Sequence, residues 1–92
     1  MLLVIGATLA HGPARAEMAS AAGLANTCFS CHGTDGKSAG AMPTIAGKSA
    51  AYIVEKLTSF KSGALESTIM GRIAKGFSDA EIDALAKFFS GQ

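Results

Sequence analysis

The sequence lacks most of the features by which a chain is readily assigned to a function. Its 92 residues include only two cysteines, two histidines and two prolines, with no basic run and no alternating β-branched run. This length accommodates one domain at most, and nothing in it suggests a nucleic-acid partner. After residue 16 no apolar stretch is long enough to cross a membrane. We therefore expect that part of the chain to be soluble and to have no membrane contact.

Both cysteines lie in one short motif, Cys28-Phe29-Ser30-Cys31-His32. The Cys-x-x-Cys-His spacing is the signature of covalent haem c attachment. Each thiolate adds across one haem vinyl group, and one helical turn sets the two sulfurs at the separation of those vinyls. The imidazole of His32 then lies beneath the ring, where it can bind iron as an axial ligand. A single motif predicts a single haem.

Other uses of the two cysteines fit the sequence less well. A zinc site needs four ligands, and outside this motif the only further histidine is His11. A thioredoxin-like dithiol needs a βαβ context, for which the sequence has no strand pattern. A structural disulfide across so short a loop would leave the adjacent histidine unexplained.

The first sixteen residues have the features of a secretory signal peptide. An apolar run over 2–10 precedes Ala14-Arg15-Ala16, which resembles a signal-peptidase site. The run is too short to span a bilayer, so an uncleaved anchor is the weaker alternative, and no basic n-region precedes it. Cleavage would remove Arg15 and leave seven basic residues against seven acidic ones. We expect a signal over 1–16, a haem domain over 17–92 and a periplasmic location, which agrees with haem attachment outside the cytoplasm.

Helical periodicity predicts an all-α domain of about four helices packed around the haem. We expect helices over 18–30, 49–62 and 68–75, and a last helix opened by the capping box Ser78-Asp79-Ala80-Glu81. Residues 33–47 form a glycine-punctuated loop with a turn at 34–36. The apolar faces comprise Ala22, Leu24, Ala25, Cys28 and Phe29; Ile53, Leu57 and Phe60; and Ile82, Leu85, Ala86 and Phe89. A domain this small buries too little apolar surface to be stable alone and needs a further stabilising group, here the haem. We therefore expect the apoprotein to be largely unfolded.

Several surrounding positions allow two interpretations. A carbonyl near Pro43 would accept a hydrogen bond from the second ring nitrogen of His32, or Pro43 only stiffens the loop. Gly23 either admits a crossing helix or is simply tolerated. Tyr52 is expected beside the core with its hydroxyl in water, the alternative being a bond to a haem propionate. Two lysines, Lys56 and Lys61, are expected to point to solvent.

Iron needs a second axial ligand, and the candidates are Met18, Met42 and Met70, because no second histidine remains after residue 16. A methionine thioether raises the reduction potential of the iron. Met18 shares a helix with the cysteines and should point away, while Met42 lies on the loop expected beside His32. Met70 opens a short helix in the C-terminal half, which allows the chain to return across the other haem face. We predict Met70 as the ligand.

Several segments resemble a class I cytochrome c: the haem motif with Gly33, the loop leading to Pro43-Thr44-Ile45-Ala46-Gly47, and the segment 52–63. The run 67–78, STIMGRIAKGFS, closely resembles the cytochrome subunit of flavocytochrome c sulfide dehydrogenase. The resemblance covers nearly all of 17–92. It implies a cytochrome c domain in which Cys28 and Cys31 hold one haem c and His32 and Met70 are its axial ligands.

By the same resemblance, a separate flavoprotein subunit oxidises sulfide at FAD and passes electrons to this haem, which hands them to a soluble cytochrome. This chain would then be an electron-transfer subunit of a heterodimer, and no enzyme by itself. A free soluble cytochrome c carrier is the alternative. A haem-based gas sensor or peroxidase-like enzyme is a weaker one, because it would need an open sixth position, which Met70 argues against.

Overall fold

Four α-helices and one 3₁₀ turn make up residues 20–92, the part of the chain described by a computed structural model. In order they are α2 (Ala21–His32), η1 (Thr34–Gly36), α3 (Ala50–Ser62), α4 (Met70–Lys75) and α5 (Asp79–Ser90). No strand occurs over 20–92, so the all-α prediction is confirmed. The expected signal peptide over 1–16, the domain start at 17 and Met18 lie outside the described residues.

Serine side chains fix where the three long helices begin. Ser20, Ser49 and Ser78 each accept a hydrogen bond at 3.1 Å from the backbone N–H three residues later, which satisfies a free donor of the first turn. At α5 the predicted capping box is complete, because the Glu81 carboxylate also accepts from the Ser78 N–H at 2.9 Å. At the other end of α3, Gly63 adopts a left-handed conformation with φ 87°. The predicted bounds of α3 and the start of α5 are thus confirmed.

Two predicted helices have different bounds in the structure. The first begins at Ala21 because Ser20 caps it, and it continues to His32, two residues beyond the predicted end. The helix expected over 68–75 begins only at Met70. Ala22, assigned to the apolar face of the first helix, is exposed, because that face is centred on the fully buried Ala25.

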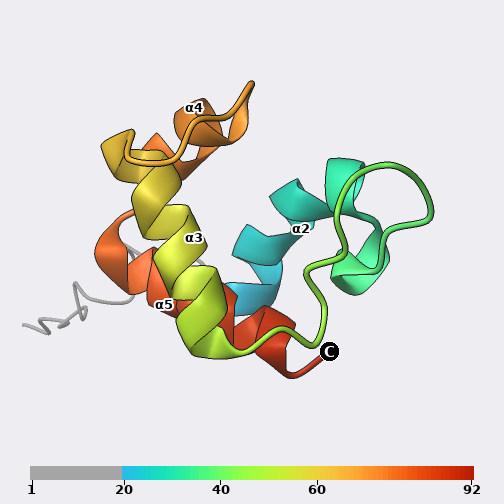
Figure 1. Ribbon diagram of the computed structural model, residues 1–92. Helices are drawn as coiled ribbons and strands as arrows, with labels where there is room; N and C mark the ends of the chain where they lie inside the picture. The colour runs from blue at the N-terminus through green and yellow to red at the C-terminus, as the bar shows by residue number, and fades with distance from the viewer. Residues whose placement is uncertain (1–19) are drawn as a thin grey trace, which may run out of the picture.

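α5 lies between α2 and α3 and packs against both, while α4 packs against the end of α3 (Figure 1). The buried core consists of Ala25 from α2, Ile53 from α3 and three residues of α5, Leu85, Ala86 and Phe89. Two alanines in this core allow α2 and α5 to approach closely. Among residues 20–92, a Cβ added at Gly23 would contact only the Ser20 side chain, so no helix of this part crosses closely at that glycine.

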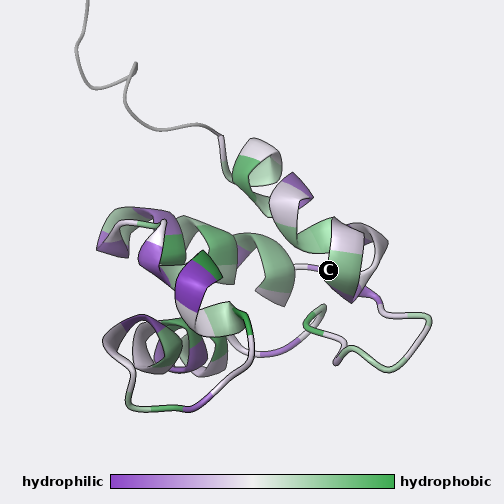
Figure 2. Cartoon of the chain, turned by 90° about the horizontal axis from the view of Figure 1, so that it is seen from above, coloured by the Kyte–Doolittle hydropathy of each residue, from purple (hydrophilic) through white to green (hydrophobic). Residues whose placement is uncertain are grey.

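Aromatic packing ties the first helix to the last. The ring of Phe89 is buried and meets the rings of Phe29 and Phe88 edge-on, with centroids 6.2 Å and 5.2 Å apart. Such edge-to-face pairs add to the free energy of burial. Hydrophobic and hydrophilic residues alternate along the helices (Figure 2), as helices with one buried face require.

Gly36 is the tightest backbone position of this core. Its φ is +81°, and a Cβ there would lie 2.8 Å from side-chain atoms of both Ile45 and Phe89. We predict that Gly36→Ala lowers the free energy of unfolding of the haem-loaded protein by roughly 3 kcal/mol, from backbone strain together with overpacking. Gly63→Ala is the matched control, since Gly63 has φ +87° but open space around it, and should cost about 1 kcal/mol. Equal losses in denaturant titrations would contradict the packing argument.

Candidate haem-binding site

The motif residues lie on the last turn of α2. Cys28 and Cys31 stand one turn apart on the helix, and both side chains and that of His32 line a cavity. Helical spacing of three residues puts the two sulfurs on one face, as the predicted attachment to a haem edge requires. Both cysteines are free thiols in the structure.

The chain reverses direction immediately after His32. Gly33 has φ +89°, and a Cβ there would overlap the Lys37 carbonyl oxygen, so this turn requires glycine. Two backbone hydrogen bonds then fix the loop that follows. The Ile45 N–H donates to the Gly36 carbonyl within the loop at 2.9 Å, and the Gly47 N–H donates to the Phe89 carbonyl of α5 at 2.9 Å. The loop is thereby held alongside the histidine.

This loop orients the imidazole of His32. Nδ1 lies 2.7 Å from the Pro43 carbonyl oxygen, and since a carbonyl only accepts, Nδ1 carries the proton. Nε2 is therefore left with a free lone pair, the form in which an imidazole binds a metal. The predicted contact with the backbone near Pro43 is thus present.

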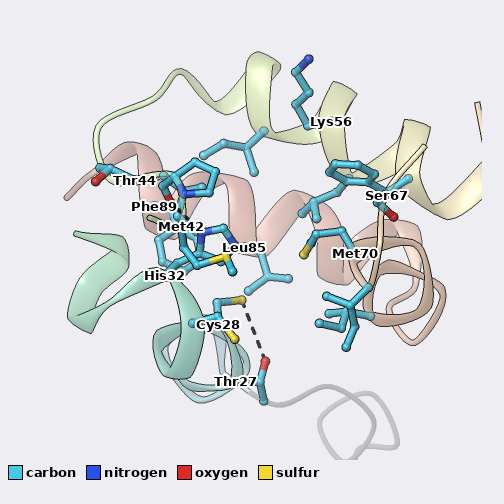
Figure 3. Close-up of a pocket in the computed structure, with 18 of the residues that line it drawn as sticks. Thr27, Cys28, His32, Met42, Thr44, Lys56, Ser67, Met70, Leu85 and Phe89 are labelled. Atoms are coloured by element: carbon cyan, nitrogen blue, oxygen red, sulfur yellow. Dashed lines mark hydrogen bonds between the residues drawn. The ribbon is translucent and has the colours of Figure 1, made fainter. Parts of the chain in front are cut away.

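A cavity of about 430 Å³ lies between α2, α3, α4 and the two loops that connect α2 with α3 and α3 with α4. His32 and Met70 lie on opposite sides of it, with the Met70 sulfur pointing inward and Cys28 between them at its base (Figure 3). Leu85 and Phe89 of α5 also line it. Met42 lies close to His32 in the same view, on the loop side where the sequence places it.

Large apolar side chains around this cavity are left open to solvent. Met42, Tyr52, Ile69 and Ile73 are 50%, 44%, 53% and 38% exposed, and all four line the cavity. Apolar surface exposed together in one concave patch marks a binding site. A flat apolar macrocycle in this cavity would cover them, so these residues fit a haem.

The only charged side chain lining the cavity, among the residues described, is that of Lys56. The ammonium groups of Lys56 and Lys48 lie 5.4 Å and 5.7 Å from the centroid of the Tyr52 ring, within cation–π range. One expectation is therefore wrong: Tyr52 belongs to the cavity rim and not to the core. The cause is the cavity, which removes the neighbours that would bury Tyr52. Lys56 lies at the same rim, with its ammonium directed away from the cavity (Figure 3).

The two thiols differ in their surroundings. Burial raises the pKa of Cys28, and a hydrogen bond with the Thr27 hydroxyl, 3.9 Å away, partly opposes this (Figure 3). Cys31 is exposed. The neutral thiol is thus favoured at Cys28, because a buried thiolate loses hydration.

The other uses of the motif find no support over residues 20–92. No group of three or more His, Cys, Asp or Glu side chains placed to hold a metal ion occurs there, and four-coordinate zinc needs such a group. The βαβ context of a redox dithiol is also missing from this part. None of its helices has the length and apolarity of a membrane span.

Sequence patterns did not identify all of the lining. Leu65 lies in no predicted helix, and Ile45, Thr44 and Ser67 come from loops, yet all four line the cavity. Their only sequence signal is the presence of apolar or hydroxyl residues in otherwise polar, glycine-rich segments. The two cysteines, His32 and Met70 are all brought to the one cavity.

The fold and this site define a small all-helical domain of the c-type cytochrome class. A family model described as "Cytochrome c" matches residues 16–91. The chain belongs to the cytochrome c family, whose members carry haem c and transfer electrons. The class I cytochrome c fold is thereby confirmed.

Individual relatives agree. The chain is 48% identical over 66 residues, 72% of its length, to the cytochrome subunit of sulfide dehydrogenase of Chlorobaculum tepidum, which confirms the resemblance. It is 39% identical over 94% of its length to a thiosulfate dehydrogenase electron acceptor of Stutzerimonas stutzeri, 41% of which it covers. A solved cytochrome c4 of Acidithiobacillus ferrooxidans superposes with a TM-score of 0.67 at 38% identity, over 71% of this chain and 38% of that one. The chain spans between 27% and 60% of the length of the first relatives it matches.

The exposed apolar rim predicts that the chain does not fold stably without haem. A Cys28→Ala/Cys31→Ala variant, unable to form either thioether, should lose most of its helical circular dichroism and its cooperative thermal transition. Ser30→Ala, an exposed position inside the motif, is the matched control and should melt like the unmodified haem-loaded protein. Cooperative melting and native helicity in the double variant would refute the prediction.

Proposed function

We propose that this chain is a periplasmic electron-transfer protein with one covalent haem c, and that it is the haem subunit of a sulfide dehydrogenase. In this proposal Cys28 and Cys31 hold the haem, and His32 and Met70 are its axial ligands. The supporting observation is that one apolar cavity is lined by both thiols, with Cys28 at its base and with the His32 imidazole and the Met70 thioether on opposite sides (Figure 3). When bound, haem supplies a one-electron change at its iron.

Residues of the chain itself would allow the haem iron to be oxidised and reduced repeatedly. The Pro43 carbonyl keeps the proton of the neutral ring on Nδ1 of His32, so the other ring nitrogen has the lone pair that a metal would bind. Leu57, Phe60 and Leu85 keep water from the cavity wall. Fixed ligands and a dry wall limit the rearrangement that accompanies a change of charge.

The sulfide dehydrogenase partner is supported by the 48% identity to such a cytochrome subunit and by the cavity rim. Among the described residues no carboxylate lines the cavity and Lys56 is its one charged side chain, so the surface around a bound haem would be poor in charge. An apolar, charge-poor contact surface is typical of a lasting interface, whereas a transient carrier relies more on charge for steering. FAD and sulfide chemistry would then belong to the flavoprotein partner, and this chain would not be an enzyme by itself.

Met70 and Met42 both line the cavity and provide a matched pair of variants. We predict that Met70→Ala abolishes the low-spin spectrum of the purified haem protein and lowers its reduction potential by on the order of 0.1 V or more. Met42→Ala should preserve the spectrum, because Met42 lies on the His32 side. An unchanged spectrum and potential in Met70→Ala would show that the axial ligand is another group.

The partner is tested by purifying the untagged protein from its native host and following haem and flavin absorbance together. We expect both to elute in one fraction whose haem is reduced on addition of sulfide. Reduction by thiosulfate instead would make the chain a thiosulfate dehydrogenase electron acceptor, like the Stutzerimonas relative. Haem eluting alone, unresponsive to sulfide even with a flavoprotein added, would establish the free carrier. Binding of CO to the reduced protein would favour a sensor or peroxidase-like role.

A further inference from the structure

The helix that carries Met70 depends on its neighbours for its position. α4 has six residues, includes Gly71, and receives no side-chain cap from Ile69. Helices this short are unstable in isolation. α4 packs on α3, but Ile69 and Ile73 remain exposed. Contacts outside α4 must therefore keep Met70 on its side of the cavity.

Two side-chain hydrogen bonds hold the ends of this helix. At its start, the Ser67 hydroxyl accepts from the Gly71 N–H at 2.8 Å. At its end, the Phe77 N–H donates to the Ala74 carbonyl at 3.1 Å, and the Phe77 carbonyl accepts from the Lys61 ammonium at 2.6 Å. Lys61 lies in the last turn of α3, so this bond joins the end of α3 to the turn between α4 and α5.

The Phe77 carbonyl is the main partner of Lys61. Asp79 also lies within reach, with its carboxylate 3.5 Å from Nζ, but that side chain is 96% exposed while the Lys61 side chain is 32% exposed. Ion pairs open to water contribute little, whereas a short hydrogen bond from an ammonium group is strong. The expectation that Lys61 points to solvent is therefore wrong, because the Phe77 turn passes over the end of α3.

We propose that Lys61 is a positioning residue for Met70. By holding the turn after α4 against α3, it keeps α4 seated with the Met70 sulfur directed into the cavity. Lys61 does not line the cavity, so it acts through α4 and not by contact with haem. This inference rests on the proposed function, in which Met70 is the second axial ligand.

The test compares Lys61→Met with Lys87→Met, a lysine on the exposed side of α5, in haem-loaded full-length protein. Imidazole is titrated into the ferric form while the charge-transfer band of methionine-ligated iron is followed. We expect Lys61→Met to lose the band at about tenfold lower imidazole, the effect of one charge-assisted hydrogen bond, with unchanged far-ultraviolet circular dichroism. Lys87→Met should match the unmodified protein, Lys61→Arg should restore most of the resistance, and Asp79→Asn should change it by no more than about twofold.

Met70→Ala separates the two proposals. If Met70→Ala retains the band, the ligand assignment fails, and the role of Lys61 fails with it. If Met70→Ala loses the band but Lys61→Met titrates like Lys87→Met, only the role of Lys61 is overturned.

Should Lys61→Met not yield folded protein, nuclear magnetic resonance of the unmodified haem protein decides. Slow water exchange of the Lys61 ammonium with coupling to the Phe77 carbonyl carbon is expected, and fast exchange without coupling overturns the proposal.

Discussion

The rest of the structure depends on the apolar cavity between α2, α3 and α4. Over residues 20–92 the largest fully buried side chains are only Phe89, Ile82 and Leu85, few for a domain that must hold four helices together. Much of the remaining apolar surface faces the cavity, whose lining comes from both connecting loops as well as from the helices. A haem in that position would be part of the core. The interaction that enables electron transfer would then also complete the fold.

The two sides of the cavity are built with different rigidity. The His32 side lies at the end of a twelve-residue helix packed on α5, and its loop is held by backbone hydrogen bonds to Gly36 and Phe89. The Met70 side is a six-residue helix supported by Ser67 and Lys61. His32 is thus held by a long helix and its loop, while Met70 lies on a short helix that packs on α3, buries Ala74 and is further held by these two polar contacts. With the proposed ligands, we expect sequence changes at the contact between α3 and α4 to affect the position of Met70 more than that of His32.

Local chemistry allowed most of the fold to be predicted. The capping box at Ser78 and the haem motif both depend on residues within one turn of each other, and the structure contains both. Contacts between distant segments could not be predicted in this way. Lys61 is polar and lies on a helix, so its sequence suggested solvent, and only the passage of a turn sixteen residues later makes it a structural donor. Tyr52 was predicted beside the core because it adjoins the apolar face of its helix, but that face borders the cavity at this position.

The residues that would determine haem binding differ from those that would determine the choice of electron donor. Cavity-lining positions such as Leu57, Leu85 and Phe89 face inward, so haem constrains them whichever protein reduces it. This explains how one chain can be similar both to a sulfide dehydrogenase subunit and to a thiosulfate dehydrogenase acceptor. In the proposed complex a donor would contact the surface left around a bound haem and not the cavity wall, and apolar contact there would favour a lasting complex. We therefore expect donor choice to depend on that outer surface, where substitutions can alter the partner without changing the residues that line the cavity.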